Sequence, residues 1–247
     1  MNSAKFSKPY VAGRIPVLEC LRARRRRARK LFYLGSAQGL EEILAAAAGI
    51  PVETRDRYAL DQMTAGVPHQ GVVLDAEPLP LLGVNDWLAG LGEAPQACAL
   101  LLDGIEDPHN FGAVIRSAAA FGASGVLFGK DRAAPLSTST MKAAAGAVEH
   151  VPLVQVTNLS RGMRQLKEAG FWVSGLDASG DRLLWEADLR GRSLIVVGSE
   201  GEGIHRLVRE SCDFLVRIPI EGAITSLNAS VSAAIALAEW KRQSHTA

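Results

Sequence analysis

The sequence predicts an α/β protein with a small N-terminal domain and a larger parallel-sheet domain, on three observations. Helical and strand-like patterns alternate along most of the 247 residues. Residues 77–97, EPLPLLGVNDWLAGLGEAPQA, are rich in proline and glycine and separate two such stretches. The strand-like runs of the second stretch are apolar throughout, which is typical of a parallel sheet covered on both faces. We therefore expect a flexible tail at residues 1–8, an α/β domain over 9–77, a linker over 78–97 and the second domain over 98–247.

The N-terminal domain is expected to contain three helices and three strands. Apolar residues at helical spacing predict helices, and short β-branched or aromatic runs predict strands. In chain order, these are a helix at 16–25, a strand at 31–35, a helix at 39–49, a strand at 50–54, a helix near 58–63 and a strand at 71–76. One further short helix, residues 85–91, is expected inside the linker.

Six apolar runs predict the strands of the second domain. They lie at residues 98–103, 124–129, 151–156, 171–177, 193–198 and 214–220, and helical patterns lie between or after them at 111–121, 138–146, 159–169, 204–211 and 229–242. Ligands of such sheets bind beyond the carboxyl ends of the strands. Three polar loops are expected there, DGIEDPHN, GSEGEG and IPIEGAITSLN. These loops form the predicted functional site.

Composition excludes several classes of protein. The chain is 48% hydrophobic and 21% charged, as in a globular protein with an apolar core. Its apolar runs fall short of the about 20 residues of a membrane span, and the first residues lack the apolar stretch of a signal peptide. We therefore expect a cytoplasmic protein. Three widely spaced cysteines and five histidines show no metal-ligand spacing, so we expect free thiols and no metal, with His109 of interest only because it lies in a polar loop.

Basic residues are concentrated near the N-terminus. Residues 1–37 contain ten Lys and Arg residues against one acid, Glu19, and RARRRRARK supplies seven of them. Many charge runs are only solvated surface, but charges this dense repel one another unless a polyanion is close. The pattern favours nucleic acid as a partner. The residues expected to contact it are Arg22, Arg24, Arg25, Arg26, Arg27, Arg29 and Lys30.

The polar loops exclude two common chemistries and indicate a third. GEGIHR lacks the third glycine of a dinucleotide-binding loop. Val197 replaces the first glycine of a nucleophile elbow. In the third loop, Ser226 or Asn228 alone would be explained as a helix N-cap. Both together, after a glycine turn, indicate a backbone-lined pocket for an adenosyl or similar polar ligand.

Taken together, the three loops resemble the SpoU (TrmH) family of RNA ribose 2′-O-methyltransferases in the SPOUT class. Its Asn-x-Gly-x-x-x-Arg pattern is matched in HNFGAVIR, its Gly-x-Glu-Gly-x-Gly pattern in GSEGEG, and its Ile-Pro…Ser-Leu-Asn-x-Ser pattern in IPIEGAITSLNAS. Ser199 stands where many members have asparagine. The N-terminal segment, from YVAGRIPVLECL to HQGVVL, resembles the substrate-binding domain of the subgroup that methylates a guanosine of 23S ribosomal RNA.

The resemblance implies a trefoil knot at the carboxyl end of the sheet, S-adenosylmethionine as cofactor, RNA as substrate and a homodimer formed through the knotted domain. The implied cofactor-binding residues are Gly198, Gly201, Ile218, Ser226 and Leu227. The implied catalytic residues are Asn110, Arg116, Glu200, Ser226 and Asn228. An arginine side chain has a pKa above about 12, so we expect it to stabilise a developing alkoxide while gripping a phosphate. We further expect Asn110 to face Arg116 across the turn.

Two other functions remain open at this point. The same catalytic loops occur in methyltransferases that act on transfer RNA, although those often carry basic helical extensions instead of an α/β domain. A non-catalytic RNA-binding protein would explain the basic segment equally well, but it would not require the complete set of catalytic residues. We therefore expect an enzyme that acts on 23S ribosomal RNA, either as free RNA or in a large-subunit assembly intermediate.

Overall fold

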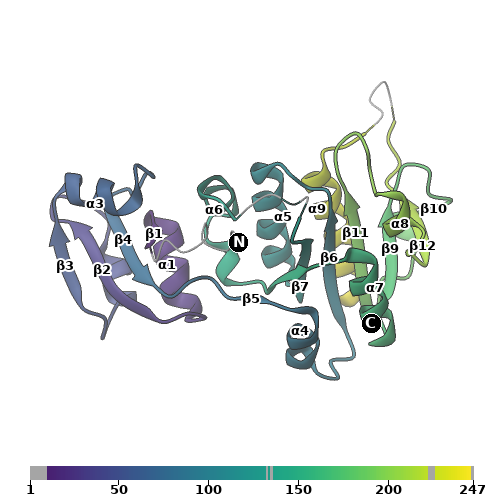
Figure 1. Ribbon diagram of the computed structural model, residues 1–247, viewed down its shortest axis with the longest axis horizontal. Helices are drawn as coiled ribbons and strands as arrows, with labels where there is room; N and C mark the ends of the chain where they lie inside the picture. The colour runs from purple at the N-terminus through teal and green to yellow at the C-terminus, as the bar shows by residue number, and fades with distance from the viewer. Residues whose placement is uncertain (1–9, 132, 134–135, 222–225, 246–247) are drawn as a thin grey trace.

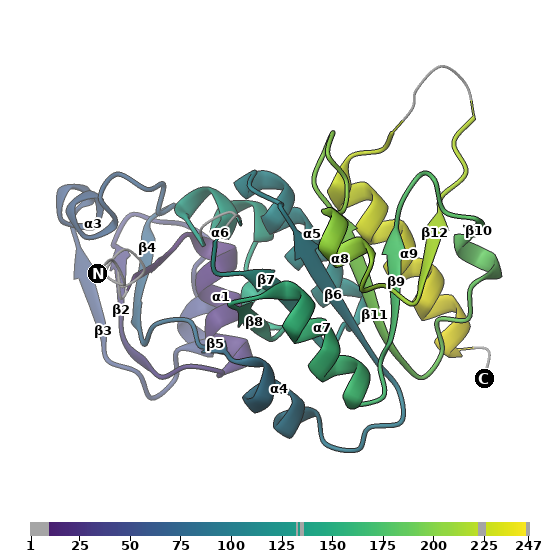
Figure 2. The ribbon, with the colours of Figure 1, turned by 45° about the vertical axis from the view of Figure 1, so that its right-hand side comes forward.

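A computed structural model describes residues 10–131, 133, 136–221 and 226–245 (Figure 1). The molecule is elongated, with the small N-terminal domain at one end and the larger α/β domain at the other. Figure 2 shows the same arrangement after a turn that brings helix α7 to the front of the larger sheet. The predicted fold class is confirmed.

The N-terminal domain is a four-stranded sheet with helices on both faces. Its elements are β1 (Tyr10–Ala12), α1 (Arg14–Ala23), β2 (Ala28–Leu34), α2 (Glu41–Ala46), β3 (Val52–Arg55), α3 (Arg57–Thr64) and β4 (Val72–Ala76). The strand order is β1-β4-β2-β3, and β2 and β3 are parallel while the other pairs are antiparallel. Neighbouring residues of β2 face opposite cores, because Leu31 packs with α1 and α2 whereas Phe32 packs with α3. Strand β1 was not predicted.

The larger domain has an eight-stranded sheet in which every pairing is parallel. Its order is β10-β12-β9-β11-β6-β7-β8-β5. The strands are β5 (Leu81–Leu82), β6 (Ala97–Asp103), β7 (Gly125–Gly129), β8 (Leu153–Val156), β9 (Trp172–Leu176), β10 (Arg182–Leu183), β11 (Arg192–Gly198) and β12 (Phe214–Arg217). The helices are α4 (Val84–Leu91), α5 (Pro108–Phe121), α6 (Thr138–Ala144), α7 (Leu159–Glu168), α8 (Arg206–Arg209) and α9 (Ala229–His245), with short 3₁₀ turns at Ala147–Glu149 and Leu184–Glu186.

The segment expected to be a linker contributes to the larger domain. Strand β5 pairs with β8 at the edge of the sheet. Helix α4 buries Trp87 against the core, and the indole donates a hydrogen bond to the carbonyl of Ser124 at 2.8 Å. Residues 81–91 are therefore held by the sheet of the second domain.

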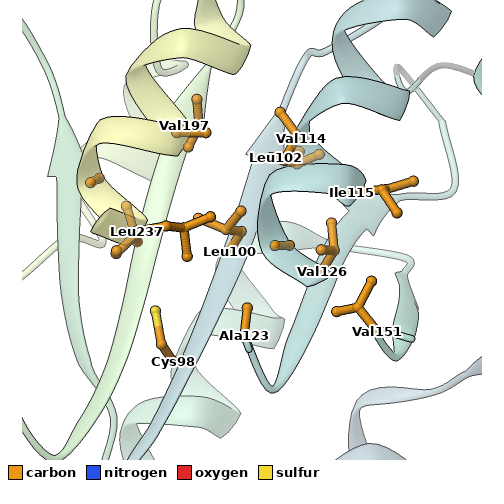
Figure 3. Packing of buried hydrophobic residues seen from close by; sticks show 14 of the residues in the cluster. Cys98, Leu100, Leu102, Val114, Ile115, Ala123, Val126, Val151, Val197 and Leu237 are labelled. Atoms are coloured by element: carbon orange, nitrogen blue, oxygen red, sulfur yellow. The ribbon is translucent and has the colours of Figure 1, made fainter. Parts of the chain in front are cut away.

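Both faces of the larger sheet are buried. Residues Leu100 and Leu102 of β6 pack beneath α5 and α9 (Figure 3). Their neighbours Ala99 and Leu101 face the core beneath α4, α7 and α8. Gly112 of α5 permits the close approach of α6, since a Cβ atom there would lie 2.6 Å from the Cβ of Ala143. The glycine of the Asn-x-Gly-x-x-x-Arg pattern is thus required by helix packing.

An ion pair between two buried side chains joins the domains. Arg26 donates to both carboxylate oxygens of Glu149, and its side chain is only 7% exposed, against 1% for Glu149. Arg26 also donates to the carbonyl of Glu77 at 3.1 Å. Next to it, Arg25 donates to the carbonyl of Val151 at 2.9 Å. These contacts correct the expectation that Arg25 and Arg26 bind nucleic acid, because both guanidinium groups are used in the contact with the second domain.

The sequence interpretation implies a knot at the carboxyl end of the sheet, where β12 is followed by α9. Residues 222–225, between β12 and α9, lie outside the described residues, so the crossing itself is not traced here. None of the described helices has the length and apolarity of a membrane span. Within the described residues, no group of three or more His, Cys, Asp or Glu side chains is placed to hold a metal ion.

Candidate active site

The three polar loops meet at one edge of the parallel sheet, the upper edge in Figure 1. Strand β6 ends there at Asp103, β11 at Gly198, and β9 and β12 at Leu176 and Arg217. Because all of these strands are parallel, their carboxyl ends lie at the same edge. This arrangement brings together segments that are about 100 residues apart in the sequence.

Helix α5 begins earlier than predicted, and this places Asn110 in its first turn. Asp107 is the N-cap, and its carboxylate accepts hydrogen bonds from the backbone N–H groups of His109 at 3.1 Å and Asn110 at 3.4 Å. Pro108 occupies the first helical position, where its missing N–H costs nothing. The side-chain amide of Asn110 consequently projects from regular helical backbone.

The loop after β11 folds back tightly on itself. Ser199 and Gly203 exchange two backbone hydrogen bonds of 3.0 Å each. A Cβ atom on Gly198 would lie 2.1 Å from the carbonyl carbon of Gly203, so only glycine fits at this position. The fold of this loop places Glu200 at its tip, exposed to solvent.

Three predicted catalytic residues are linked by hydrogen bonds. The side-chain N–H group of Asn110 donates to Glu200 Oε1 at 2.9 Å. The side-chain N–H group of Asn228 donates to Asn110 Oδ1 at 2.8 Å and also to Glu200 Oε1. The Oδ1 atom of Asn228 accepts from the backbone N–H of Ser230 at 2.9 Å and so caps α9. Each of the three loops therefore contributes one side chain to this Asn110–Glu200–Asn228 network.

A cavity of about 650 Å³ opens beside this network. Its lining includes all five residues predicted to bind the cofactor, namely Gly198, Gly201, Ile218, Ser226 and Leu227. Its volume lies within the about 300–1,000 Å³ of small-molecule sites. Ser226 lies in its wall, but no side-chain hydrogen bond from it is found among the described residues.

Sequence reasoning missed the contribution of β9 to this cavity. Leu176, Asp177 and Ala178 line it at the carboxyl end of that strand. Although burial would raise it, the pKa of Asp177 is lowered by hydrogen bonds from Ser179 and Arg209. The rule that placed the other loops at this edge applies equally to β9, and would have identified Asp177.

The residues present fit S-adenosylmethionine. Glycine-rich backbone at 198–203 and the apolar side chains of Ile218 and Leu227 suit an adenosyl group. Glu200 and Glu202 supply negative charge in the wall beside Asp177, which is paired with Arg209, and this suits a ligand with cationic sulfur and amino groups. The chemistry of the wall therefore agrees with the cofactor implied by the sequence.

Arg116 does not contact Asn110, and this corrects the sequence interpretation. Both residues lie in α5, six positions apart, which places them about 240° apart around the helix axis. Arg116 is exposed, and no described residue forms a hydrogen bond or an ion pair with its guanidinium group. Asn110 instead bonds to Glu200 and Asn228. The guanidinium group is consequently available to a ligand or a second protein chain.

A second cavity, of about 670 Å³, shares part of its wall with the first. Ser199, Glu200 and Glu202 line both. Asn110 and His205 line only the second. The hydrogen-bonded network therefore lies between two adjoining spaces, one suited to the cofactor and one open to a substrate.

Comparison with known proteins agrees with the sequence interpretation over nearly the whole chain. The profile of the SpoU rRNA Methylase family matches residues 97–238, and that of RNA 2′-O ribose methyltransferase substrate binding matches residues 10–82. The 23S rRNA (guanosine-2′-O-)-methyltransferase RlmB of Pseudomonas aeruginosa is 46% identical over 202 residues, 81% of each chain. The putative TrmH family tRNA/rRNA methyltransferase YacO of Bacillus subtilis is 41% identical over 243 residues, 95% of each chain.

Solved structures show the same architecture. An AdoMet-bound rRNA methyltransferase from Sinorhizobium meliloti superposes with a TM-score of 0.77 at 25% identity, covering 94% of this chain and 86% of its own. The SpoU methyltransferase AviRb from Streptomyces viridochromogenes, in complex with AdoMet, has the same fold, with a TM-score of 0.78 at 23% identity over 95% and 89% of the two chains.

Fold, loops and cavity together define an RNA ribose 2′-O-methyltransferase of the SPOUT class. More particularly, the chain belongs to the SpoU rRNA methylase family.

Proposed function

We propose that this enzyme transfers a methyl group from S-adenosylmethionine to the 2′-hydroxyl of a guanosine in 23S ribosomal RNA, in the cytoplasm. The observation that carries the proposal is the Asn110–Glu200–Asn228 network, which joins all three loops beside a cavity suited to the cofactor. The choice of 23S ribosomal RNA rests on the P. aeruginosa relative, whose name specifies that substrate and whose match spans 81% of this chain.

The chain's own residues bind and orient the reactants. When bound, the cofactor supplies a methyl group already activated on a cationic sulfur. The carboxylates of Glu200 and Glu202 would favour a cation at this place. The amide groups of Asn110 and Asn228 are fixed by their mutual hydrogen bond and can hold the ribose in line with the methyl group. Arg116 would grip the adjacent phosphate and stabilise negative charge developing on the 2′-oxygen.

The proposed activity is tested with methyl-labelled S-adenosylmethionine and total RNA from a strain that lacks this protein. We expect label on the ribose of one guanosine in 23S ribosomal RNA, located by mapping the labelled fragment. Label in transfer RNA would contradict the choice of substrate, and label in no RNA would contradict the enzymatic function. Repeating the assay with large-subunit precursor particles distinguishes free RNA from an assembly intermediate.

We infer that RNA binds the outward face of the arginine-rich segment. Arg24, Arg27 and Arg29 are exposed, while Arg25 and Arg26 face the second domain. Arg22 and Lys30 also remain on the proposed RNA surface, although each already pairs with a glutamate, Glu42 and Glu53 respectively. Among the described residues, no acid pairs with Arg24 or Arg27. These two arginines are therefore the best candidates for phosphate contacts.

Replacing Arg24 and Arg27 together by glutamate is expected to weaken RNA binding and to flatten its salt dependence. Each lost phosphate contact removes about 0.7–0.9 from the slope of log affinity against log salt concentration. The measurement is filter binding or fluorescence anisotropy at several salt concentrations. The matched control is Arg161→Glu with Arg164→Glu, two exposed arginines on α7. Equal losses in both double variants would show that only overall charge matters.

We also propose a homodimer formed through α5 and α9. These helices lie side by side on one face of the sheet (Figure 3). Arg116 of α5 and Val231 of α9 are exposed. A dimer through this face would place Arg116 beside RNA bound at the junction of the two protomers. It would also cover Val231, which is 46% exposed in the single chain.

Replacing Val231 by arginine is therefore expected to shift the protein from dimer to monomer and to reduce methyl transfer. Analytical ultracentrifugation measures the first effect, and the labelled-methyl assay measures the second. Leu207→Arg on α8 is the control, because Leu207 is also an exposed apolar residue, 61% exposed, but lies on the opposite face of the sheet. A wild-type protein that sediments as a fully active monomer would contradict the proposed dimer.

A further inference from the structure

His205 occupies the N-cap position of α8 but does not cap it. Ser, Thr, Asp and Asn are preferred at such positions because their side chains accept backbone hydrogen bonds. The imidazole of His205 instead contacts Asp103, at the carboxyl end of β6. The residue at this N-cap position thus contacts the end of β6 and does not cap α8.

Asp103 holds His205 through two hydrogen bonds. Its Oδ2 accepts the backbone N–H of His205 at 2.7 Å, and its Oδ1 lies 3.0 Å from the ring Nδ1. The carboxyl group is buried, since Asp103 is 4% exposed. Gly104 lets the ring lie against the chain, because a Cβ atom there would be 3.0 Å from the Cε1 atom of His205. The ring is thus fixed in both position and rotation.

This contact also determines which ring nitrogen is free. A carboxylate offers only acceptors, so the Nδ1 atom of His205 carries the hydrogen that Asp103 receives. In the neutral ring, the Nε2 atom is then the nitrogen that keeps its lone pair, whereas a charged ring carries a hydrogen on both nitrogens. Glu202 Oε2 lies 3.7 Å from Nε2, close enough for an ion pair with a charged ring but beyond hydrogen-bonding distance. A buried aspartate behind an imidazole whose outer nitrogen is free is the arrangement of a proton acceptor.

His205 opens onto the same space as the catalytic network. The second cavity is lined by His205 together with Asn110 and Glu200. The other ionisable groups that face this space are Glu106, Asp107 and Glu202. Glu200 Oε1 already accepts hydrogen bonds from Asn110 and Asn228, and Arg116 does not line the cavity. A proton leaving a ribose hydroxyl in this cavity therefore meets one imidazole with a free nitrogen among the described residues.

We propose that His205 Nε2, oriented by Asp103, accepts the proton of the RNA 2′-hydroxyl during methyl transfer. This inference rests on the proposed function and deepens it. A bond forms between the 2′-oxygen and the methyl carbon, while the carbon–sulfur bond breaks and its electron pair stays on sulfur. The hydroxyl proton passes to Nε2, directly or through one water, and is then released to solvent. Arg116 retains its proposed role of stabilising the charge on the oxygen, and it no longer has to remove the proton.

The first test is the rate of a single turnover with saturating S-adenosylmethionine and 23S ribosomal RNA. We expect His205→Ala to lower the rate by about 10²- to 10⁴-fold, with the affinities for cofactor and RNA unchanged. Added imidazole should restore part of the rate, which the loss of a purely structural side chain would not allow. His109→Ala is the matched control, because His109 is an exposed histidine in the first turn of α5, and its loss should leave the rate unchanged.

The second test needs no turnover. Nitrogen NMR of the cofactor-free protein should show His205 with its hydrogen on Nδ1, and Asp103→Asn should abolish that preference. A ring that carries both hydrogens at the pH of the assay would overturn the inference. A His205→Ala variant with the wild-type rate, in a preparation that methylates RNA, would overturn this inference alone. A wild-type protein that methylates no RNA would overturn the inference together with the proposed function.

Discussion

Arg116→Ala is expected to lower the rate of methyl transfer by about 10²- to 10³-fold, the usual cost of removing one group that stabilises a developing oxyanion. Binding of S-adenosylmethionine should remain unchanged, because Arg116 does not line the cofactor cavity. The side chain is exposed and forms no ion pair with any described residue, so its removal should cost little stability. Single-turnover rates and calorimetric titration of the cofactor separate the two effects.

Two further variants of the same experiment define the role of Arg116. Arg116→Lys keeps the charge but loses the forked pair of donors that holds a phosphate and a second oxygen at once. We therefore expect it to recover only a small part of the rate. Arg164→Ala is the matched control, an exposed helical arginine on the opposite face of the sheet. Near-normal transfer by Arg116→Ala would refute the role of this residue.

Most of the fold could be predicted because its signals are local. Continuous apolar runs such as CALLLD are buried on both faces, and all six strands expected in the second domain are present. The strands missed, β1, β5 and β10, have two or three residues each and are defined by their partners in the sheet. Helix α5 starts before its apolar pattern does, because Asp107 and Pro108 determine its N-terminus.

The meeting of the three loops at one edge of the sheet was predictable, but the contacts among their side chains were not. The rule for parallel sheets places the three loops at one edge, and the motif spacing identifies Asn110, Glu200 and Asn228. The contacts of Asn110 depend on where α5 begins. Because the helix starts at Pro108, Asn110 and Arg116 lie on different sides of it, and the apolar pattern of the sequence did not show this start. His205 was set aside because the histidines show no metal-ligand spacing. Its contact with Asp103, 102 residues away in the chain, is not visible in the sequence.

In the arginine-rich segment, the charge pattern alone does not determine which side chains are exposed and which contact the second domain. Seven basic residues in RARRRRARK look equivalent in the sequence. In the structure the chain turns at Arg24, which has a left-handed backbone conformation, and extends from Ala28 as β2. This path directs Arg25 and Arg26 towards the second domain and leaves Arg24 and Arg27 exposed. The segment thus serves both to join the domains and, in our proposal, to bind RNA.

Arg26→Met is expected to destabilise the protein by about 3–5 kcal/mol, the usual cost of breaking a buried ion pair. The variant leaves the carboxylate of Glu149, which is 1% exposed, without its cation. Urea unfolding measures the loss. All four tryptophans lie in the second domain and all three tyrosines in the first, so tryptophan fluorescence follows the domain that contains Glu149. Arg22→Met is the control, because Arg22 is half-exposed and its ion pairs are worth at most about 1 kcal/mol.

The double variant Arg26→Met, Glu149→Met separates a buried charge from a lost contact. If the cost arises from an unpaired buried carboxylate, removing both charges should restore most of the stability, because apolar side chains of similar volume can replace such a pair. If the double variant is as unstable as Arg26→Met, the hydrogen bond from Arg26 to the carbonyl of Glu77 is the important contact instead. The Arg26 side chain is buried between the domains and presents almost no surface to RNA. In either case we therefore expect the affinity for RNA, measured at low temperature, to change less in the Arg26 variants than in the Arg24→Glu, Arg27→Glu variant.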